Sequence, residues 1–307
     1  MSTSPNEKRV VAVVGATGRQ GGGLVRSIAA DPDGGFTVRA VTRDAGSPRA
    51  KELAGLGAEV VVADLDDPAS VEAAFTGAYG AFCVTNAQEH PPERETAHAA
   101  TMAAAARRAG VAHVVWSTFE DTRTFVRPGD DRMPPLPGGY LVPHYDAKGA
   151  ADAEFDAAST TFLRTAFYWE NLLDSGGPAR GDDGVRTLAL PLGSARLPGI
   201  AVADIGRCAH AILRRPELAG KTVSVTGENL TGAELAAGFA EFLGEPVRFQ
   251  DVPVTAFPAE LANMFRFTQD FETAYAGARD PAEVRALHPG LLTFRQWLFE
   301  NPERTSR

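Results

Sequence analysis

Two side chains that can donate protons lie one helical turn apart near the middle of the chain. His144 and Lys148 are four residues apart, a spacing that places both on one face of a predicted helix. An imidazole with an ordinary pKa near 6.5 can act as an acid, so His144 is a candidate catalytic residue. We interpret Lys148 as cofactor-binding as well as catalytic. Ser117, at the end of the predicted strand 113–117, is either a third catalytic group or only a strand-end hydroxyl.

A glycine-rich turn near the start of the chain predicts a dinucleotide site. Five apolar residues, 10–14, form a predicted buried strand, and Gly15, Gly18 and Gly21 follow at the spacing GxxGxxG. The first glycine permits a sharp turn, the second lets backbone N–H groups approach a pyrophosphate, and the third allows close packing of helix on strand. The phosphates would lie at the N-terminus of the following helix, which favours anions.

The end of the second predicted strand, 36–42, indicates which nicotinamide cofactor is bound. A site selective for NAD usually has a carboxylate here, whereas this chain has Thr42 and Arg43. A guanidinium can bind the 2′-phosphate of NADP(H) with two hydrogen bonds, so Arg43 predicts NADP(H), although Asp44 follows it. Ser47 could add a hydroxyl to this contact. The alternative is a solvated surface arginine.

Polar side chains also follow the later predicted strands, at the edge of the sheet where such folds bind ligands. Asp64 follows the third strand and is placed to meet the adenine amine, with Leu65 packing on the ring. The residues after the fourth strand are expected to face the pyrophosphate or a ribose, and they are Thr85, Asn86 and Ala87. The turn after the sixth strand is expected to wall the nicotinamide side of the site, with core packing as the alternative for its aromatic residues. This turn consists of Tyr168, Trp169, Glu170 and Asn171.

The alternation of strands and helices predicts an α/β fold, a Rossmann-type doubly wound parallel sheet with a smaller, interleaved α/β C-terminal lobe. Residues 1–165 are expected to form the NAD(P)-binding domain, with its sheet completed within about 200–227. Residues 166–200 and 228–307 are expected to form the smaller substrate or partner lobe. A proline-rich stretch, 119–143, is long enough to be a lid, a partner-binding segment or a mobile region.

Composition excludes several other classes of protein. The chain has 307 residues, of which 44% are hydrophobic and 22% charged, which is typical of a soluble globular protein. A net charge of −9 argues against direct binding of nucleic acid. No apolar run is long enough to span a membrane and the polar start lacks a signal sequence, so a cytoplasmic location is expected. The two cysteines, Cys83 and Cys208, are expected to be buried, and their spacing indicates neither a metal site nor a disulfide framework.

Six motifs make the chain similar to a known family. They are GATGRQGG (15–22), VTRD (41–44), VTN (84–86), HYDAKG (144–149), YWENLL (168–173) and LANMFRF (261–267). With these motifs the sequence resembles the NmrA-like family, in its HSCARG branch of atypical short-chain dehydrogenases. Typical short-chain dehydrogenases pair a serine with Tyr-x-x-x-Lys. Here His144 stands in place of the tyrosine, and Tyr145 is rotated away by about 100° on the helix.

The resemblance implies an NADP(H)-binding redox sensor or negative regulator, in which dehydrogenase activity is weak or absent and contacts with a partner protein change with cofactor occupancy. It also implies that Lys148 holds the nicotinamide ribose. The alternative is an NADPH-dependent reductase of a small carbonyl, quinone or enone, with His144, Tyr145 or Ser117 as the proton donor. A monomer or homodimer is expected. The cofactor contacts that the resemblance implies are Gly15, Thr17, Gly18, Arg19, Gln20, Arg43, Asp64, Leu65, Thr85, Asn86, His98, Lys148 and residues 168–171.

Overall fold

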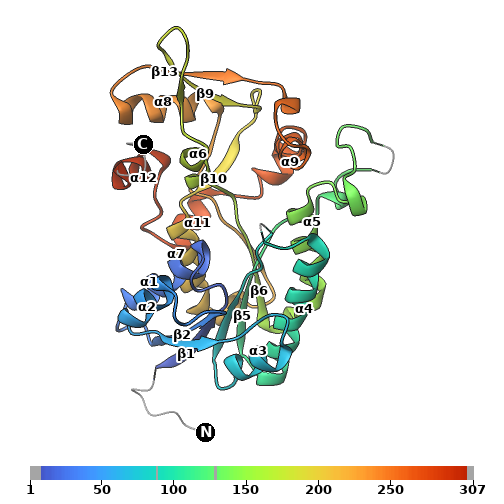
Figure 1. Cartoon of the computed structure of the whole chain (residues 1–307), viewed down its shortest axis with the longest axis vertical. Helices are drawn as coiled ribbons and strands as arrows, with labels where there is room; N and C mark the ends of the chain where they lie inside the picture. Colours follow the sequence, from blue (N-terminus) through green and yellow to red (C-terminus); the bar gives the residue numbers. More distant parts are fainter. Residues whose placement is uncertain (1–7, 88, 128–129, 303–307) are drawn as a thin grey trace. The chain divides into compact units, whose positions relative to one another are not determined.

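The computed structural model describes residues 8–87, 89–127 and 130–302, which fold into two compact units (Figure 1). Unit 1 contains the described residues up to Glu120, together with Ala147–Arg164 and Ile205–Val223. Unit 2 contains the described residues of Asp121–Asp146, Thr165–Asp204 and the chain from Ser224 onward. The predicted absence of a signal sequence concerns residues 1–8, of which 1–7 lie outside the described residues. In the described part of the chain, no helix is both long and apolar enough to cross a membrane.

A seven-stranded sheet forms the centre of unit 1. Its strand order is β11-β6-β5-β4-β1-β2-β3, and all the pairings from β6 through to β3 are parallel. The order reverses between β1 and β4, and folds of this type bind ligands at that point, outside the carboxyl ends of the strands. The predicted doubly wound α/β fold is therefore confirmed. The strands are β1 (Arg9–Val13), β2 (Phe36–Thr42), β3 (Glu59–Val62), β4 (Gly80–Cys83), β5 (His113–Thr118), β6 (Thr160–Arg164) and β11 (Thr222–Ser224).

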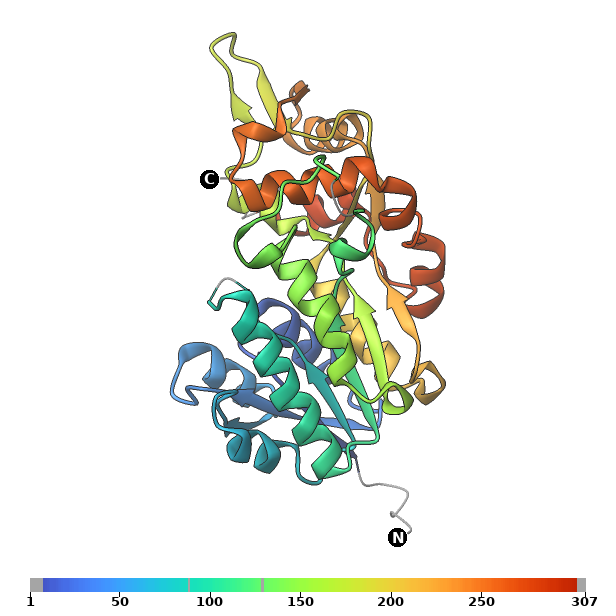
Figure 2. The same ribbon diagram turned by 90° about the vertical axis from the view of Figure 1, so that its right-hand side faces the viewer.

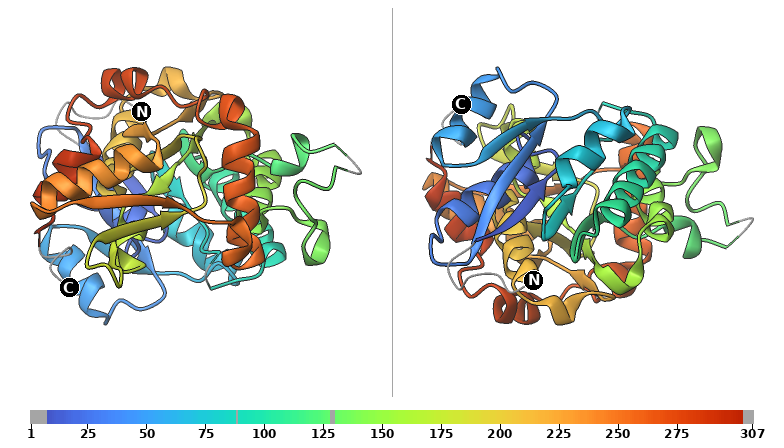
Figure 3. Two further views of the ribbon diagram at one scale, coloured as in Figure 1. Left: turned by 90° about the horizontal axis from the view of Figure 1, so that it is seen from above. Right: turned by 90° about the horizontal axis from the view of Figure 1, so that it is seen from below.

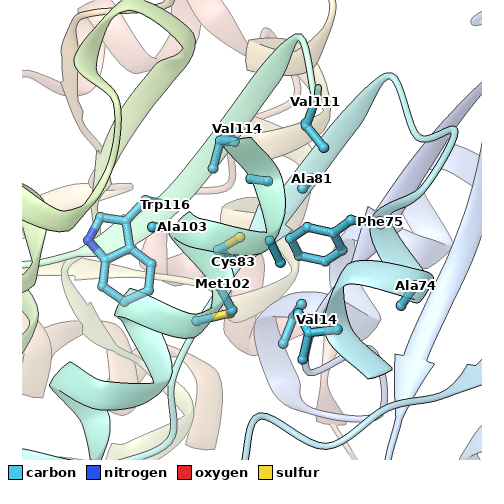
Figure 4. Close-up of a cluster of buried hydrophobic side chains, with 14 of the residues drawn as sticks. Val14, Ala74, Phe75, Ala81, Cys83, Met102, Ala103, Val111, Val114 and Trp116 are labelled. Carbon is cyan, nitrogen blue, oxygen red and sulfur yellow. The ribbon is translucent and has the colours of Figure 1, made fainter. Parts of the chain in front are cut away.

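Helices cover both faces of this sheet (Figure 3, right). On one face, α3 and α4 pack over β1, β4 and β5 in a core that includes Phe75, Cys83, Met102 and Trp116 (Figure 4). On the other face, α1 and α7 approach so closely that a Cβ on Gly206 would lie 2.3 Å from the backbone carbon of Gly23. These helices are α1 (Arg19–Ala29), α2 (Pro48–Gly55), α3 (Pro68–Phe75), α4 (Pro92–Ala109), α5 (Pro143–Ala151) and α7 (Val202–Leu213), of which α5 and α7 begin in unit 2.

Unit 2 contains two three-stranded sheets, with the orders β12-β10-β7 and β13-β9-β8. Helix α8 packs along β13 and β9 (Figure 3, left), and it begins at the predicted capping box of Thr231 and Glu234. The strands are β7 (Phe167–Tyr168), β8 (Ala179–Arg180), β9 (Arg186–Leu190), β10 (Leu197–Ile200), β12 (Glu228–Leu230) and β13 (Val247–Asp251). The helices are α6 (Glu170–Asp174), α8 (Gly232–Leu243), α9 (Ala259–Asp270), α10 (Glu272–Tyr275), α11 (Pro281–Leu287) and α12 (Phe294–Glu300).

The proline-rich segment of unit 2 is held in place by side-chain hydrogen bonds. The fully buried carboxylate of Asp146 accepts bonds from the N–H and hydroxyl of Thr122 and from the N–H groups of Leu141 and Val142. Asn263 of α9 donates to the carbonyl oxygen of Leu141 at 2.8 Å, and α9 runs beside the segment (Figure 2). Apart from two short 3₁₀ turns, the described part of the segment has no helix or strand before α5, because these side chains bind its backbone instead.

Candidate functional site

The glycine turn between β1 and α1 has the geometry that a bound pyrophosphate requires. Gly15 has a φ of +64°, and the N–H of Gly18 donates to its carbonyl oxygen at 2.8 Å. A Cβ on Gly18 would lie 3.1 Å from that oxygen, and a Cβ on Gly21 would lie 2.3 Å from it. Helix α1 begins after Gly18 with neither a side-chain cap nor an acidic residue in its first turn. Its positive end is therefore available to an anion, and the turn fits a dinucleotide.

Residues at the start of α1 divide between exposed and buried positions. Gly18 and Arg19 are exposed, whereas Gln20 is buried and accepts a 2.8 Å hydrogen bond from the hydroxyl of Ser117. The carbonyl oxygen of Thr17 accepts a bond from Arg49 of α2 at 3.3 Å. Arg49 is a cation beside the turn that the sequence analysis did not predict, because nothing in the sequence indicates that α2 returns to this turn.

The end of β2 presents Arg43 to solvent. Its side chain is 61% exposed, and one guanidinium nitrogen lies 2.7 Å from the carboxylate of Glu89. An anion bound by Arg43 would compete with this carboxylate. The hydroxyl of Ser47, predicted to contact the cofactor, caps α2 by accepting a hydrogen bond from the N–H of Ala50. Asp44 likewise accepts a bond from the N–H of Gly46 within the same turn.

The segment after β3 uses its carboxylates in local hydrogen bonds. Asp64 accepts from the N–H of Asp66, and Leu65 packs partly buried against the core of unit 1. Asp66 in turn lies 2.9 Å from the buried ring of His98 on α4, and it also pairs with Arg94. These hydrogen bonds lower the pKa of Asp66, with the bond to His98 as the largest cause. His98, which the resemblance alone implies as a cofactor contact, is therefore held beside this turn by Asp66.

Lys148 reaches the end of β4 and forms a buried set with Thr85 and Glu95. Its ammonium nitrogen lies 2.5 Å from the hydroxyl oxygen of Thr85, 3.0 Å from the carbonyl oxygen of Thr85 and 3.1 Å from Glu95 Oε1. All three side chains are at least nine-tenths buried. Asn86 and Ala87, which follow Thr85, are exposed and half-buried respectively. Two predicted cofactor contacts, Thr85 and Lys148, are thus brought together in unit 1.

Glu95 was not predicted from the sequence, although the sequence contains a signal for it. Glu95, Ala99, Met102 and Ala106 recur at helical spacing, and all four are buried in α4. A carboxylate in phase with an apolar stripe must find a buried partner, because an unpaired buried charge is costly. The partner, Lys148, lies 53 residues further along the chain, so the pattern around Glu95 does not identify it.

Each of the three candidate proton donors is engaged within its own unit. In unit 1, the buried hydroxyl of Ser117 donates to Gln20. In unit 2, the hydroxyls of Tyr145 and Tyr275 lie 2.9 Å apart and both side chains are buried. His144, also in unit 2, lies 2.6 Å from Glu260, and this hydrogen bond lowers the pKa of Glu260.

The turn after β6 places two of its four side chains, Trp169 and Glu170, in the core of unit 2. Trp169 is 1% exposed and fits against two glycines, since a Cβ would lie 2.1 Å from the indole at Gly199 and 2.5 Å from it at Gly227. The carboxylate of Glu170 accepts bonds from the N–H of Val202, at the start of α7, and from the indole of Trp297. Tyr168 is half-buried and Asn171 is exposed, so these two have the accessible side chains of the turn.

Asp152 follows Lys148 by four residues in the sequence. Its carboxylate accepts hydrogen bonds from the indole N–H of Trp116 at 2.9 Å and from the hydroxyl of Thr118 at 2.7 Å. Burial raises its pKa to about 6 from 3.8, and the bonds from Thr118 and Trp116 offset only part of this shift. The folded protein therefore keeps a proton between about pH 4 and pH 6 that the unfolded chain has released. The contribution of Asp152 to the free energy of unfolding is therefore greatest at low pH and is lost as the pH rises from about 4 to about 6.

Asp152→Asn should remove this pH dependence. We expect the free energy of unfolding of the variant, minus that of the wild type, to rise by about 1–3 kcal/mol between about pH 4 and pH 7. Urea unfolding at a series of pH values measures the difference. Parallel curves for the two proteins would contradict the raised pKa.

The chain is similar to known proteins in sequence and in fold. The model of the NmrA-like family matches residues 7–298. The NmrA-like family domain-containing oxidoreductase malD of Malbranchea aurantiaca is 30% identical, over 97% of this chain and 98% of its own length. The NAD(P)H azoreductase of Xenophilus azovorans is 29% identical, over 78% of this chain and 76% of its own. A crystal structure of NmrA, a negative transcriptional regulator, shares the fold with a TM-score of 0.80. A second NmrA structure, in complex with NADP, shares it with a TM-score of 0.76. Both are 23% identical to this chain over 96% of each chain.

Proposed function

The chain belongs to the NmrA-like family, and on this premise we propose that it binds NADP(H) and acts as a redox-responsive regulator with little or no dehydrogenase activity. The observation that carries the proposal is the combination of an open glycine turn with proton donors that are already engaged. The turn at Gly15 to Gly21 fits a pyrophosphate, and Lys148 stands at the end of the neighbouring strand. NADPH supplies a hydride when bound, but reduction of a carbonyl also needs a proton source.

Binding by this chain divides among three groups of residues. Backbone N–H groups at the start of α1 bind the pyrophosphate, beside the cation Arg49. Thr85 and Lys148 lie where a ribose hydroxyl can replace one of their internal hydrogen bonds. Arg43 binds the 2′-phosphate in exchange for Glu89, which is compatible with its exposed position. NmrA, which shares the fold, has a structure in complex with NADP.

Arg43→Ala should weaken NADP(H) binding about 10- to 100-fold and leave NAD(H) binding nearly unchanged. The lost contact is with the 2′-phosphate, which NAD(H) lacks. Isothermal titration with both nucleotides measures the ratio, and Arg108→Ala is a matched control because Arg108 is also an exposed arginine of unit 1 that is paired with a glutamate, Glu72. Equal losses for both nucleotides would assign Arg43 to a general electrostatic role.

The regulatory proposal is tested by comparing binding with turnover. NADPH fluorescence should change saturably on titration with the protein, with a dissociation constant of about micromolar or tighter. Oxidation of NADPH in the presence of quinones, enones, small carbonyls and azo dyes should stay at the rate of the buffer. Binding without turnover supports a regulator, whereas the absence of binding would refute the proposal altogether.

A second candidate function is an NADPH-dependent reductase of a small carbonyl, quinone or enone. It is favoured by the names of malD, an oxidoreductase, and of the azoreductase, both similar to most of this chain. His144 is the candidate donor in this case, because its side chain is 22% exposed whereas Ser117 and Tyr145 are buried. NADPH oxidation that is lost in both His144→Ala and Lys148→Ala would select the reductase.

Three finer assignments belong to the same proposal. We place the chain in the HSCARG branch, supported by the YWENLL and LANMFRF motifs, whose Trp169, Glu170 and Asn263 all make buried contacts. We also propose a cytoplasmic location and a protein partner. The two cysteines, Cys83 and Cys208, are buried and form no disulfide, which suits a reducing compartment.

A further inference from the structure

Glu95 forms a hydrogen-bonded set with Thr85 and Lys148 that none of the predicted site residues explains. We propose that Glu95 is a positioning residue for nucleotide binding, which keeps the Lys148 ammonium charged and directed along Thr85 at the carboxyl end of β4. This inference rests on the proposed function, because Glu95 acts on the nucleotide only through Lys148.

The geometry of the set determines the orientation of the ammonium. A lysine ammonium has three N–H donors, and the two oxygens of Thr85 and Glu95 Oε1 supply three acceptors. The hydroxyl of Thr85 also donates to Glu95 Oε1 at 2.6 Å, which closes a ring of hydrogen bonds. A ligand hydroxyl that replaces one oxygen of Thr85 therefore meets an ammonium that is already oriented, and Glu95 still balances the charge.

The charge balance at Lys148 depends on Glu95. Burial lowers the pKa of Lys148 below its ordinary value, and the field and hydrogen bond of Glu95 offset only part of this shift. The other groups packed around Lys148 do not supply a negative charge to it: Trp116 presents its ring 5.5 Å from the nitrogen, and Asp152 binds Trp116 and Thr118. On α4, the next buried ionisable side chain after Glu95 is His98, which is bound to Asp66.

One feature of Glu95 argues against a purely structural role. Its second oxygen, Oε2, is buried and has no hydrogen-bond partner among the described residues. A buried carboxylate oxygen without a partner reduces stability, and a buried ion pair can often be replaced by apolar residues without loss. A glutamate at this position is therefore better explained by the charge that it provides to Lys148 than by packing.

The experiment compares Glu95→Gln with Glu93→Gln across pH. Glu93 is an exposed glutamate in the same first turn of α4, so it controls for loss of charge at the helix N-terminus. Isothermal titration with NADP⁺ from about pH 6 to about pH 9 gives the affinity of each variant relative to the wild type. We expect Glu95→Gln to match the wild type within about threefold at low pH and to bind about tenfold or more weakly at high pH, because its Lys148 loses the proton. Glu93→Gln should follow the wild type throughout.

A second measurement on the protein without nucleotide keeps this inference separate from the proposed function. NMR of protein carrying ¹³C-labelled lysine should show that Lys148 titrates at a lower pH in Glu95→Gln than in the wild type. This result supports Glu95 even if NADP⁺ does not bind, in which case only the proposed function fails. The inference would be overturned by a loss of affinity in Glu95→Gln that does not depend on pH, or by a wild-type Lys148 that is neutral near pH 7. If the variant does not fold, the measurement on the wild type still tests the inference.

Discussion

Gly21→Ala is expected to abolish measurable binding of NADP(H) and to lower the free energy of unfolding by about 1–3 kcal/mol. The added Cβ would lie 2.3 Å from the carbonyl oxygen of Gly15, a separation at which atoms must move. The obstructing atom is backbone, so the start of α1 would have to move away from β1. Backbone N–H groups at the start of α1 would then lose their position relative to a pyrophosphate, and each tenfold loss of affinity corresponds to about 1.4 kcal/mol.

Gly55→Ala is the matched control for this prediction. Gly55 is also a helical glycine of unit 1, but a Cβ there would have no heavy atom within 4 Å. Alanine is the better helix former, so this variant should be more stable by up to about 1 kcal/mol and should bind NADP(H) normally. Thermal unfolding and isothermal titration on the two variants measure both effects. Normal binding by Gly21→Ala would show that the glycine turn does not hold the nucleotide.

Asp146→Ala is expected to destabilise the protein by about 3–5 kcal/mol. Its buried carboxylate accepts four hydrogen bonds, from the N–H and hydroxyl of Thr122 and from the N–H groups of Leu141 and Val142. Removal of the carboxylate leaves these donors without their acceptor. Because Thr122 and Leu141 lie near opposite ends of the proline-rich segment, the segment should detach as a whole. Urea unfolding and limited proteolysis across 121–142 measure the two consequences.

Asp183→Ala controls for the loss of a carboxylate in unit 2. Asp183 is exposed and accepts bonds from the N–H of Val185 and from Arg248. Solvent replaces an exposed partner at little cost, so this variant should unfold at nearly the same urea concentration as the wild type. Equal effects of the two substitutions would mean that Asp146 does not hold the segment.

Sequence patterns were sufficient for the core of unit 1 and for the position of its glycine turn. The β-branched run 10–14, which forms most of β1, and the glycine spacing are local features, and so is the capping box of Thr231 and Glu234 in unit 2. Each depends on residues within a few positions of one another. Local conformational preference and hydrophobic periodicity therefore predicted the order of strands and helices. Lys148 was predicted as a cofactor contact from its spacing with His144 and from the family resemblance, and its position beside Thr85 at the end of β4 came from the structure.

Only the tertiary structure decided which buried polar groups are partners. Glu95 and Lys148, Asp146 and Thr122, and Glu170 and Trp297 are separated by 53, 24 and 127 residues in the sequence. The sequence analysis assigned Trp169 and Glu170 to the wall of a cofactor site, and the structure gives them packing and capping contacts in unit 2. A hydrogen bond is directional and short-ranged, so its partner depends on where the chain returns in space, and a one-dimensional pattern does not contain that information.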